Sequence, residues 1–225
     1  MATDPVDAVL FDLDETLCAY RRDGATVLSA AFVDAGVEPF FDVDDYYRRY
    51  GEYVADTDSV EQLRERCFAD LAEERGLDPA AGRAVARAYA DERDQTNVEA
   101  MPGAHDVVET LARDHRIGLV TNGAPGMQQT KLAALGLDGG FETVVYAGYD
   151  AASKPDPEPF DLALSDLDVE RERAVHVGNS PESDVAGAHA AGLRSVWLRE
   201  DGRSPERPPD WTVESLTELL DPPWQ

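Results

Sequence analysis

The stretch AVLFDLDETL, residues 8–17, contains a short apolar run that ends in two carboxylates. AVLF has the length and apolar character of a buried strand, and Asp12 and Asp14 follow it. Helical patterns alternate with this run and with those that follow, which predicts an α/β fold: a Rossmann-like, three-layer core around a parallel sheet of about five strands. The later runs are IGLV (117–120), TVVY (143–146), AVHV (174–177) and SVWL (195–198).

The interval between the first two runs breaks this alternation. Residues 18–97 contain several helical segments but no convincing strand, and one of the helical segments starts with Ser59 and Gln62 at the spacing of a capping box. A parallel crossover needs only about a dozen residues. We therefore predict an all-α cap domain at 18–97, inserted into a core formed by 1–17 and 98–225.

The composition limits the classes of partner. There are 46 acidic and 20 basic residues among 225, giving a formal net charge of −26. Such a charge argues against nucleic acid and anionic membranes as partners. The acid excess, with arginine largely replacing lysine, resembles proteins of halophilic archaea. With no signal-like start and no long apolar run, we expect a soluble, cytoplasmic protein.

Polar residues follow each of four predicted strands. Because ligands of an open parallel sheet bind beyond the carboxyl ends of its strands, these residues are expected to converge. Together they offer carboxylates, a hydroxyl in a glycine-containing turn and a cation, which is the set that phosphoryl transfer requires. The four groups are Asp12-Leu13-Asp14, Thr121-Asn122-Gly123, Ser153-Lys154-Pro155, and Gly178-Asn179-Ser180 with Asp184.

Four motifs carry a family resemblance. FDLDETL, VTNG, SKPDPEPF and VGNSPESDVAGA resemble, in order and spacing, the motifs of the haloacid dehalogenase superfamily of aspartate-nucleophile hydrolases. The resemblance covers the whole chain, including a helical cap inserted after the first motif. It implies a hydrolase of the phosphatase branch that acts on a small phosphorylated metabolite.

The resemblance also implies roles for individual residues. Asp12 is expected to be the nucleophile that forms an aspartyl-phosphate. Asp14 is expected to be the general acid and then the general base, and to point to the same side as Asp12, because side chains alternate along an extended chain. Thr121 and the backbone amide of Asn122 are expected to bind phosphoryl oxygens. Lys154 is expected to bridge the nucleophile and the phosphoryl group.

A Mg²⁺ ion is the cofactor that the resemblance implies. Its expected ligands are the Asp12 carboxylate, the Asp14 backbone carbonyl, Asn179 and, through water, Asp184. Magnesium retains several waters, so a few protein oxygens suffice. Because Asn179 is neutral where a carboxylate would add charge, we expect it to weaken Mg²⁺ binding without abolishing the geometry.

Other functions of the same fold stay open at this stage. The dehalogenases resemble this chain but lack an acid two residues after the nucleophile, so Asp14 favours an oxygen leaving group. Asn179 points the other way, because dehalogenases carry Asn near this position and use no metal. A phosphomutase, a 2-haloacid dehalogenase and a non-catalytic phosphate-ligand binding protein are therefore the alternatives.

Two further features are interpreted as structural, and Lys131 is given no role. The segment FFDVDDYYRRYGEYV (40–54) could use its tyrosines and Arg48 or Arg49 to bind substrate, but packing between cap helices is favoured. His176 alternates with apolar strand residues and is interpreted as a core histidine. Lys131 is, with Lys154, one of only two lysines in the chain, but it lies in no comparable motif.

Overall fold

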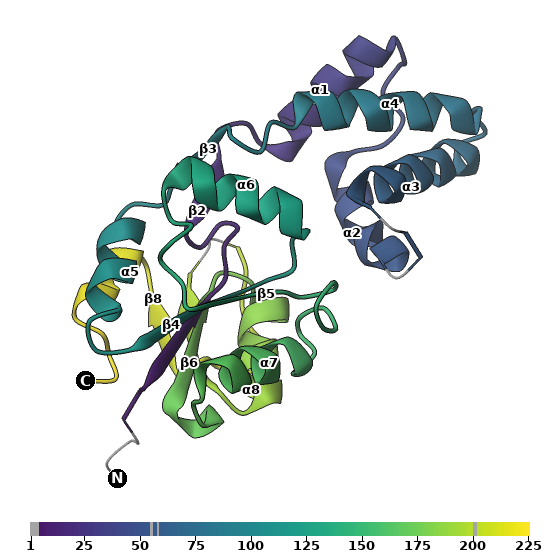
Figure 1. Cartoon of the computed structure of the whole chain (residues 1–225). Coiled ribbons are helices and arrows are strands. Elements are labelled where there is room, and N and C mark those ends of the chain that lie inside the picture. The colour runs from purple at the N-terminus through teal and green to yellow at the C-terminus, as the bar shows by residue number, and fades with distance from the viewer. Residues whose placement is uncertain (1–4, 55, 58, 200–201) are drawn as a thin grey trace. The chain divides into compact units, whose positions relative to one another are not determined.

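The computed structural model describes residues 5–54, 56–57, 59–199 and 202–225, and it divides into two compact units (Figure 1). One unit comprises Met1–Ala19 with Val98–Gln225, and the other comprises Tyr20–Asn97. None of the helices found among the described residues is long and apolar enough to cross a membrane. The strands are β1 (Ala8–Phe11), β2 (Cys18–Tyr20), β3 (Val98–Ala100), β4 (Arg116–Thr121), β5 (Thr143–Tyr146), β6 (Ala174–Gly178), β7 (Arg194–Leu198) and β8 (Trp211–Val213). The α-helices are α1 (Gly24–Ala35), α2 (Val43–Val54), α3 (Val60–Glu74), α4 (Pro79–Glu92), α5 (Ala104–Leu111), α6 (Pro125–Leu135), α7 (Glu158–Leu167) and α8 (Ala186–Ala191).

The larger unit is built on a six-stranded sheet with the strand order β5-β4-β1-β6-β7-β8. Every neighbouring pair in it is parallel, and β1 lies between β4 and β6. This confirms the predicted α/β fold, with one strand more than expected. The additional strand is β8, in which only Val213 is buried. A three-residue strand with one buried side chain is too short to give a periodic signal in the sequence.

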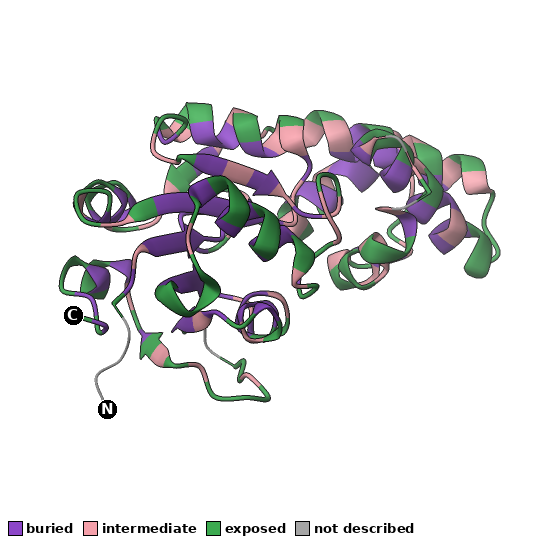
Figure 2. Cartoon of the chain, turned by 60° about the horizontal axis from the view of Figure 1, so that its bottom comes forward, coloured by how far each residue is buried: buried purple, intermediate pink, exposed green. Residues whose placement is uncertain are grey.

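Alternation along β1 places its side chains in two separate cores. Val9 and Phe11 belong to a cluster with side chains of α5, α6 and the 3₁₀ helix η3 (Leu216–Leu220). Ala8 and Leu10 belong to a second cluster with side chains of α7 and α8. Both faces of the strand are therefore covered by helices, which explains its continuous apolar sequence. Figure 2 shows buried strands between helices whose outer faces are exposed.

The smaller unit contains α1 to α4 around a core of its own. As the sequence predicted, Ser59 precedes α3 and its side chain accepts a hydrogen bond from the backbone N–H of Gln62. The rings of Tyr46 and Phe68 pack edge to face at a centroid distance of 5.1 Å. Arg49 donates to Glu74 at 2.7 Å and Arg48 pairs with Asp45. These contacts agree with the packing interpretation of segment 40–54.

One expectation about the inserted segment was wrong, since residue 18 does begin a strand. β2 pairs with β3 in a separate two-stranded sheet. Both strands contain three residues, and each has one buried side chain, Cys18 in β2 and Val98 in β3. Such short strands form because the chain on either side brings them together, and no alternating pattern in the sequence marks them.

Candidate active site

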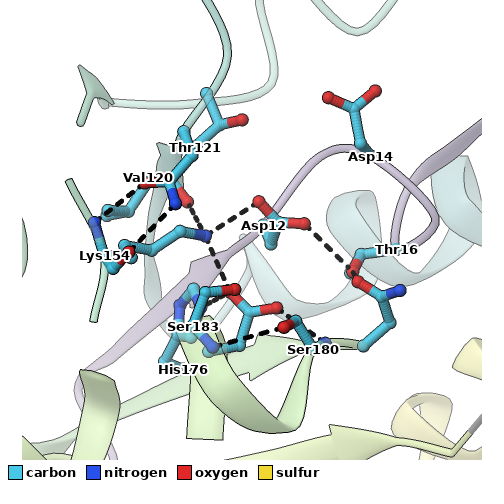
Figure 3. A network of polar contacts seen from close by, with 12 residues as sticks. Asp12, Asp14, Thr16, Val120, Thr121, Lys154, His176, Ser180 and Ser183 are labelled. Atoms are coloured by element: carbon cyan, nitrogen blue, oxygen red, sulfur yellow. Dashed lines mark hydrogen bonds and ion pairs between the residues drawn. The ribbon is translucent and has the colours of Figure 1, made fainter. Parts of the chain in front are cut away.

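Lys154 lies at the centre of a buried group of polar contacts beyond the end of β1 (Figure 3). Its ammonium donates to Oδ1 of Asp12 at 2.8 Å, to Oδ1 of Asp184 at 2.7 Å and to the carbonyl oxygen of Val120 at 2.7 Å. An ammonium group has three N–H donors, so the geometry satisfies all of them. The side chain is 1% exposed. Its position is therefore fixed, with the charge facing two carboxylates.

Asn122 holds the backbone that carries Lys154. The side-chain oxygen of Asn122 accepts from the backbone N–H of Lys154 at 2.8 Å, and its amide nitrogen donates to the Lys154 carbonyl at 3.1 Å. Because one amide makes both bonds, the segment after β5 is tied to the end of β4. The sequence predicted Asn122 only for its backbone amide, so this contact of its side chain was missed.

Asp184 is buried and accepts hydrogen bonds on both carboxylate oxygens. Oδ1 accepts from Lys154 and lies 3.0 Å from Nε2 of His176, while Oδ2 accepts from the backbone N–H of Ser180 at 2.9 Å. Asp184 belongs to a single π-helical turn, Pro181–Val185, that follows β6. The missing side chain of Gly178 makes room for it, because a Cβ there would lie 2.3 Å from Cγ of Asp184.

Two buried carboxylates share one ammonium, and their ionisation differs. Burial raises the pKa of Asp12 to about 7, although Lys154 opposes the shift. Burial acts in the same direction on Asp184, but Lys154 and the hydrogen bond from His176 outweigh it and hold the pKa of Asp184 well below its ordinary value. Burial lowers the pKa of His176, which is therefore neutral at pH 7. Asp184 stays ionised because its carboxylate accepts more hydrogen bonds than the carboxylate of Asp12 does.

Asp14 does not point to the same side as Asp12, so this expectation was wrong. β1 ends at Phe11, and the backbone N–H groups of Leu17 and Cys18 both donate to the Leu13 carbonyl. The chain turns at this point, so strand alternation does not extend to Asp14. Its carboxylate contacts two side chains of α6, and Figure 3 shows it apart from the contacts around Asp12.

Asn179 faces the same small region as the second oxygen of Asp12. Its Oδ1 and the Oδ2 of Asp12 each lie 3.4 Å from the hydroxyl oxygen of Thr16. The indole N–H of Trp197 donates to the Asn179 carbonyl at 2.9 Å and fixes the backbone there. A cavity of about 340 Å³, lined in part by Glu15 and Asn179, adjoins this region. Its size suits several ordered waters.

This oxygen set is compatible with a hydrated Mg²⁺ ion. Within the described residues, no group of three or more His, Cys, Asp or Glu side chains could hold a metal ion. Magnesium does not need such a group, because it binds through one or two protein oxygens and keeps waters. Oδ2 of Asp12 and Oδ1 of Asn179 each lie 3.4 Å from the Thr16 hydroxyl, whereas both oxygens of Asp184 accept shorter bonds.

Comparison with known proteins gives the family and the fold. The family model of the haloacid dehalogenase-like hydrolases matches residues 6–192. A phosphoserine phosphatase from Thermus thermophilus is 37% identical over 160 residues, which cover 70% of this chain and 64% of that enzyme. The pyrimidine 5'-nucleotidase YjjG from Escherichia coli is 31% identical over 95% of this chain and 96% of its own. The solved structure of the hydrolase YfnB from Bacillus subtilis has the same fold, with a TM-score of 0.76 at 22% identity over 97% of this chain and 98% of its own.

The chain belongs to the haloacid dehalogenase-like hydrolase family, in its phosphatase branch. This confirms the family, the fold class and the hydrolase that the sequence predicted. Besides the side-chain contact of Asn122, sequence reasoning missed Thr16, Gln128 and Lys131 as residues of the site. Lys131 could have been found from composition, since both lysines of a chain with 18 arginines lie at this site.

Proposed function

We propose that this chain is a Mg²⁺-dependent phosphomonoester hydrolase that acts on a small phosphorylated metabolite through an aspartyl-phosphate on Asp12. The observation that carries the proposal is the Lys154 ammonium, which lies 2.8 Å from the Asp12 carboxylate and has no free donor. A nucleophile held beside a fixed cation is what attack on a phosphate ester needs, because negative charge develops on the phosphoryl oxygens.

The reaction uses Asp12 and Asp14 in turn. A carboxylate oxygen of Asp12 attacks phosphorus, the ester P–O bond breaks, and Asp14 gives a proton to the leaving oxygen. Asp14 then takes a proton from the water that attacks the aspartyl-phosphate, which releases phosphate and restores Asp12. Lys154, Thr121 and the backbone amide of Asn122 bind the phosphoryl oxygens.

The charges of the site support a role for Mg²⁺. Asp12, Asp14 and Asp184 lie at this edge of the sheet, and Lys154 and Lys131 together compensate only part of their charge. A bound Mg²⁺ ion would neutralise the excess and favour the ionised form of Asp12. Asp12, Asn179 and the Asp14 carbonyl would hold it, with Asp184 acting through water because its oxygens accept three other bonds.

We also propose that the helical unit at 20–97 is a cap domain that selects the substrate. It interrupts the chain between β1 and β4, has its own core and leaves the sheet of the larger unit complete. Relatives named for phosphoserine and for pyrimidine nucleotides support phosphorylated metabolites as the substrate class. A cytoplasmic location also belongs to the proposal, as does the absence of nucleic-acid or membrane partners, which the net charge of −26 supports.

A panel of phosphorylated metabolites, assayed for phosphate release at high salt with and without Mg²⁺, tests this function. We expect Mg²⁺-dependent turnover that Asp12→Asn abolishes. Asp106→Asn, the same substitution at an exposed residue of α5, should retain full activity. Transfer of phosphate to a sugar hydroxyl would indicate a phosphomutase, and halide release from a 2-haloacid would indicate a dehalogenase. Substrate binding without any turnover would indicate a binding protein.

A further inference from the structure

Two side chains of α6 contact the carboxylate of Asp14. The ammonium nitrogen of Lys131 lies 2.6 Å from Oδ1, and Nε2 of Gln128 lies 2.9 Å from Oδ2. Lys131 and Gln128 are three residues apart, so one face of the helix presents both. Each oxygen of Asp14 therefore has its own donor, and the two bonds together fix the orientation of the carboxylate plane.

The burial of the two donors argues that this contact is specific. Lys131 is 2% exposed and Gln128 is fully buried, whereas the side chain of Asp14 is 38% exposed. Burying an ammonium group costs several kcal/mol before its partner is counted. A surface carboxylate needs no such partner, because water solvates it. The arrangement therefore restricts the orientation of the Asp14 carboxylate.

Gln128 also connects Asp14 to the phosphoryl-binding turn. The same Nε2 donates to Oγ1 of Thr121 at 2.7 Å. The glycine of the TNG motif leaves space for this amide, because a Cβ on Gly123 would lie 2.2 Å from Nε2 of Gln128. One side chain thus holds residues from the first and second motifs at a fixed separation.

We propose that Gln128 and Lys131 are positioning residues that hold the carboxylate of Asp14 beside the hydroxyl of Thr121, from where it exchanges a proton with the leaving oxygen. The inference rests on the proposed function, in which Asp14 gives its proton to the leaving oxygen. General acid catalysis contributes about 10²- to 10⁴-fold to a rate, and a misplacement of about 1 Å can remove about 10²-fold. A half-exposed carboxylate without these two donors would spread over several rotamers.

The test compares two substrates that differ in their need for a proton. An alkyl phosphate such as glycerol phosphate releases an alkoxide that must be protonated, whereas nitrophenyl phosphate releases a stable phenolate. The readout is the ratio of kcat on the alkyl ester to kcat on the aryl ester. Lys131→Met and Gln128→Leu should each lower this ratio about 10- to 100-fold. Gln129→Leu, on the exposed side of the same helix, should leave it unchanged.

A double substitution distinguishes the loss of Asp14 positioning from a general loss of activity. If Lys131 acts through Asp14, Lys131→Met should not lower the ratio further in a chain that already carries Asp14→Asn. Lys131→Arg should restore part of the ratio, since it retains a cationic donor. Circular dichroism shows whether Lys131→Met or Gln128→Leu fails to fold. If one of them does, the kcat ratio of the other variant decides whether the proposal holds.

Failure of this inference differs from failure of the proposed function. If the wild-type protein and Asp14→Asn behave as expected but Lys131→Met and Gln128→Leu match Gln129→Leu, the positioning role is wrong and the function stands. The same conclusion follows if both α6 variants lose activity equally on the two esters, or if Lys131→Met raises turnover. A wild-type protein without turnover, or an Asp14→Asn variant with an unchanged ratio, overturns the inference together with the role of Asp14.

Discussion

The ammonium nitrogen of Lys154 lies 2.7 Å from Oδ1 of Asp184, and neither side chain is more than 2% exposed. The same ammonium contacts Asp12, so removing it leaves two buried carboxylates without their cation. Breaking a buried ion pair from one side costs about 3–5 kcal/mol, because the remaining charge is neither solvated nor paired. Removing the Lys154 ammonium should therefore lower the stability of the protein as well as its activity.

Lys154→Met should lower the free energy of unfolding at pH 7 by about 3–5 kcal/mol. Chemical denaturation measures this change. Arg173→Met is the matched control, since it breaks a pair with Asp7 in which both side chains are more than a third exposed, and it should cost less than about 1 kcal/mol. Adding Asp184→Asn to Lys154→Met should recover part of the loss. Equal losses in Lys154→Met and Arg173→Met would show that the buried pair contributes little.

His176 should stabilise the protein through its bond to Asp184, and only while it is neutral. His176→Phe removes this bond and should cost about 1–3 kcal/mol at pH 7 and above. Because burial lowers the pKa of His176 below its ordinary value of 6.5, the unfolded chain takes up a proton below that pH more readily than the folded chain does. The wild-type protein should therefore lose its advantage over His176→Phe as the pH falls below about 6.5.

Denaturation of both proteins between pH 8 and pH 5 measures this difference. His105→Phe replaces an exposed histidine of α5 and should change the unfolding free energy much less. A gap between the wild-type protein and His176→Phe that widens as the pH falls would mean that His176 is charged when it contacts Asp184.

Mg²⁺ binding should be coupled to the ionisation of Asp12. Its pKa is raised to about 7, so below that pH the metal-free protein carries a proton that the ion must displace. The apparent Kd for Mg²⁺ should fall about tenfold for each pH unit from 5 to 7 and then level off. Intrinsic fluorescence provides the measurement, because the indole of Trp197 bonds to the Asn179 carbonyl.

Two variants control this titration. Trp197→Phe should remove the fluorescence change but leave the Mg²⁺ requirement for activity in place. Asp12→Asn should bind Mg²⁺ more weakly, and with no pH dependence between 5 and 7. A pH dependence that persists in Asp12→Asn would assign the displaced proton to another group.

The residues that the motifs contain could be identified from the sequence, whereas the residues that orient them could not. Asp12, Lys154 and Asp184 follow buried strands of a parallel sheet, so topology alone brings them to one edge. Gln128 and Lys131 belong to α6, and their direction depends on how that helix packs against the sheet. No local pattern encodes this packing, and only the rarity of lysine marked Lys131.

Asp14 shows a second limit of sequence reasoning. Its expected direction assumed that the extended chain continues past Asp12, but the turn after Leu13 redirects the side chain. Glu15 in this turn has φ of 56°, a left-handed conformation that is uncommon for a residue other than glycine. The sequence DLDET has no glycine or asparagine to mark this conformation, in which the backbone N–H of Glu15 donates to the Cys18 carbonyl at 2.8 Å.

Asn179→Asp should strengthen Mg²⁺ binding. The side-chain oxygen at this position lies 3.4 Å from the hydroxyl of Thr16, which also lies 3.4 Å from Oδ2 of Asp12, so an added charge would act on the same small region. One more negative charge near the ion should lower the Mg²⁺ concentration for half-maximal activity by about five- to tenfold. Gln129→Glu adds the same charge to an exposed site on α6 and should leave that concentration unchanged. If Asn179→Asp had no effect while Asp184→Asn abolished the response to Mg²⁺, the ion would be held without position 179, and the neutral amide would have to be explained by its contacts with Thr16 and Trp197 instead.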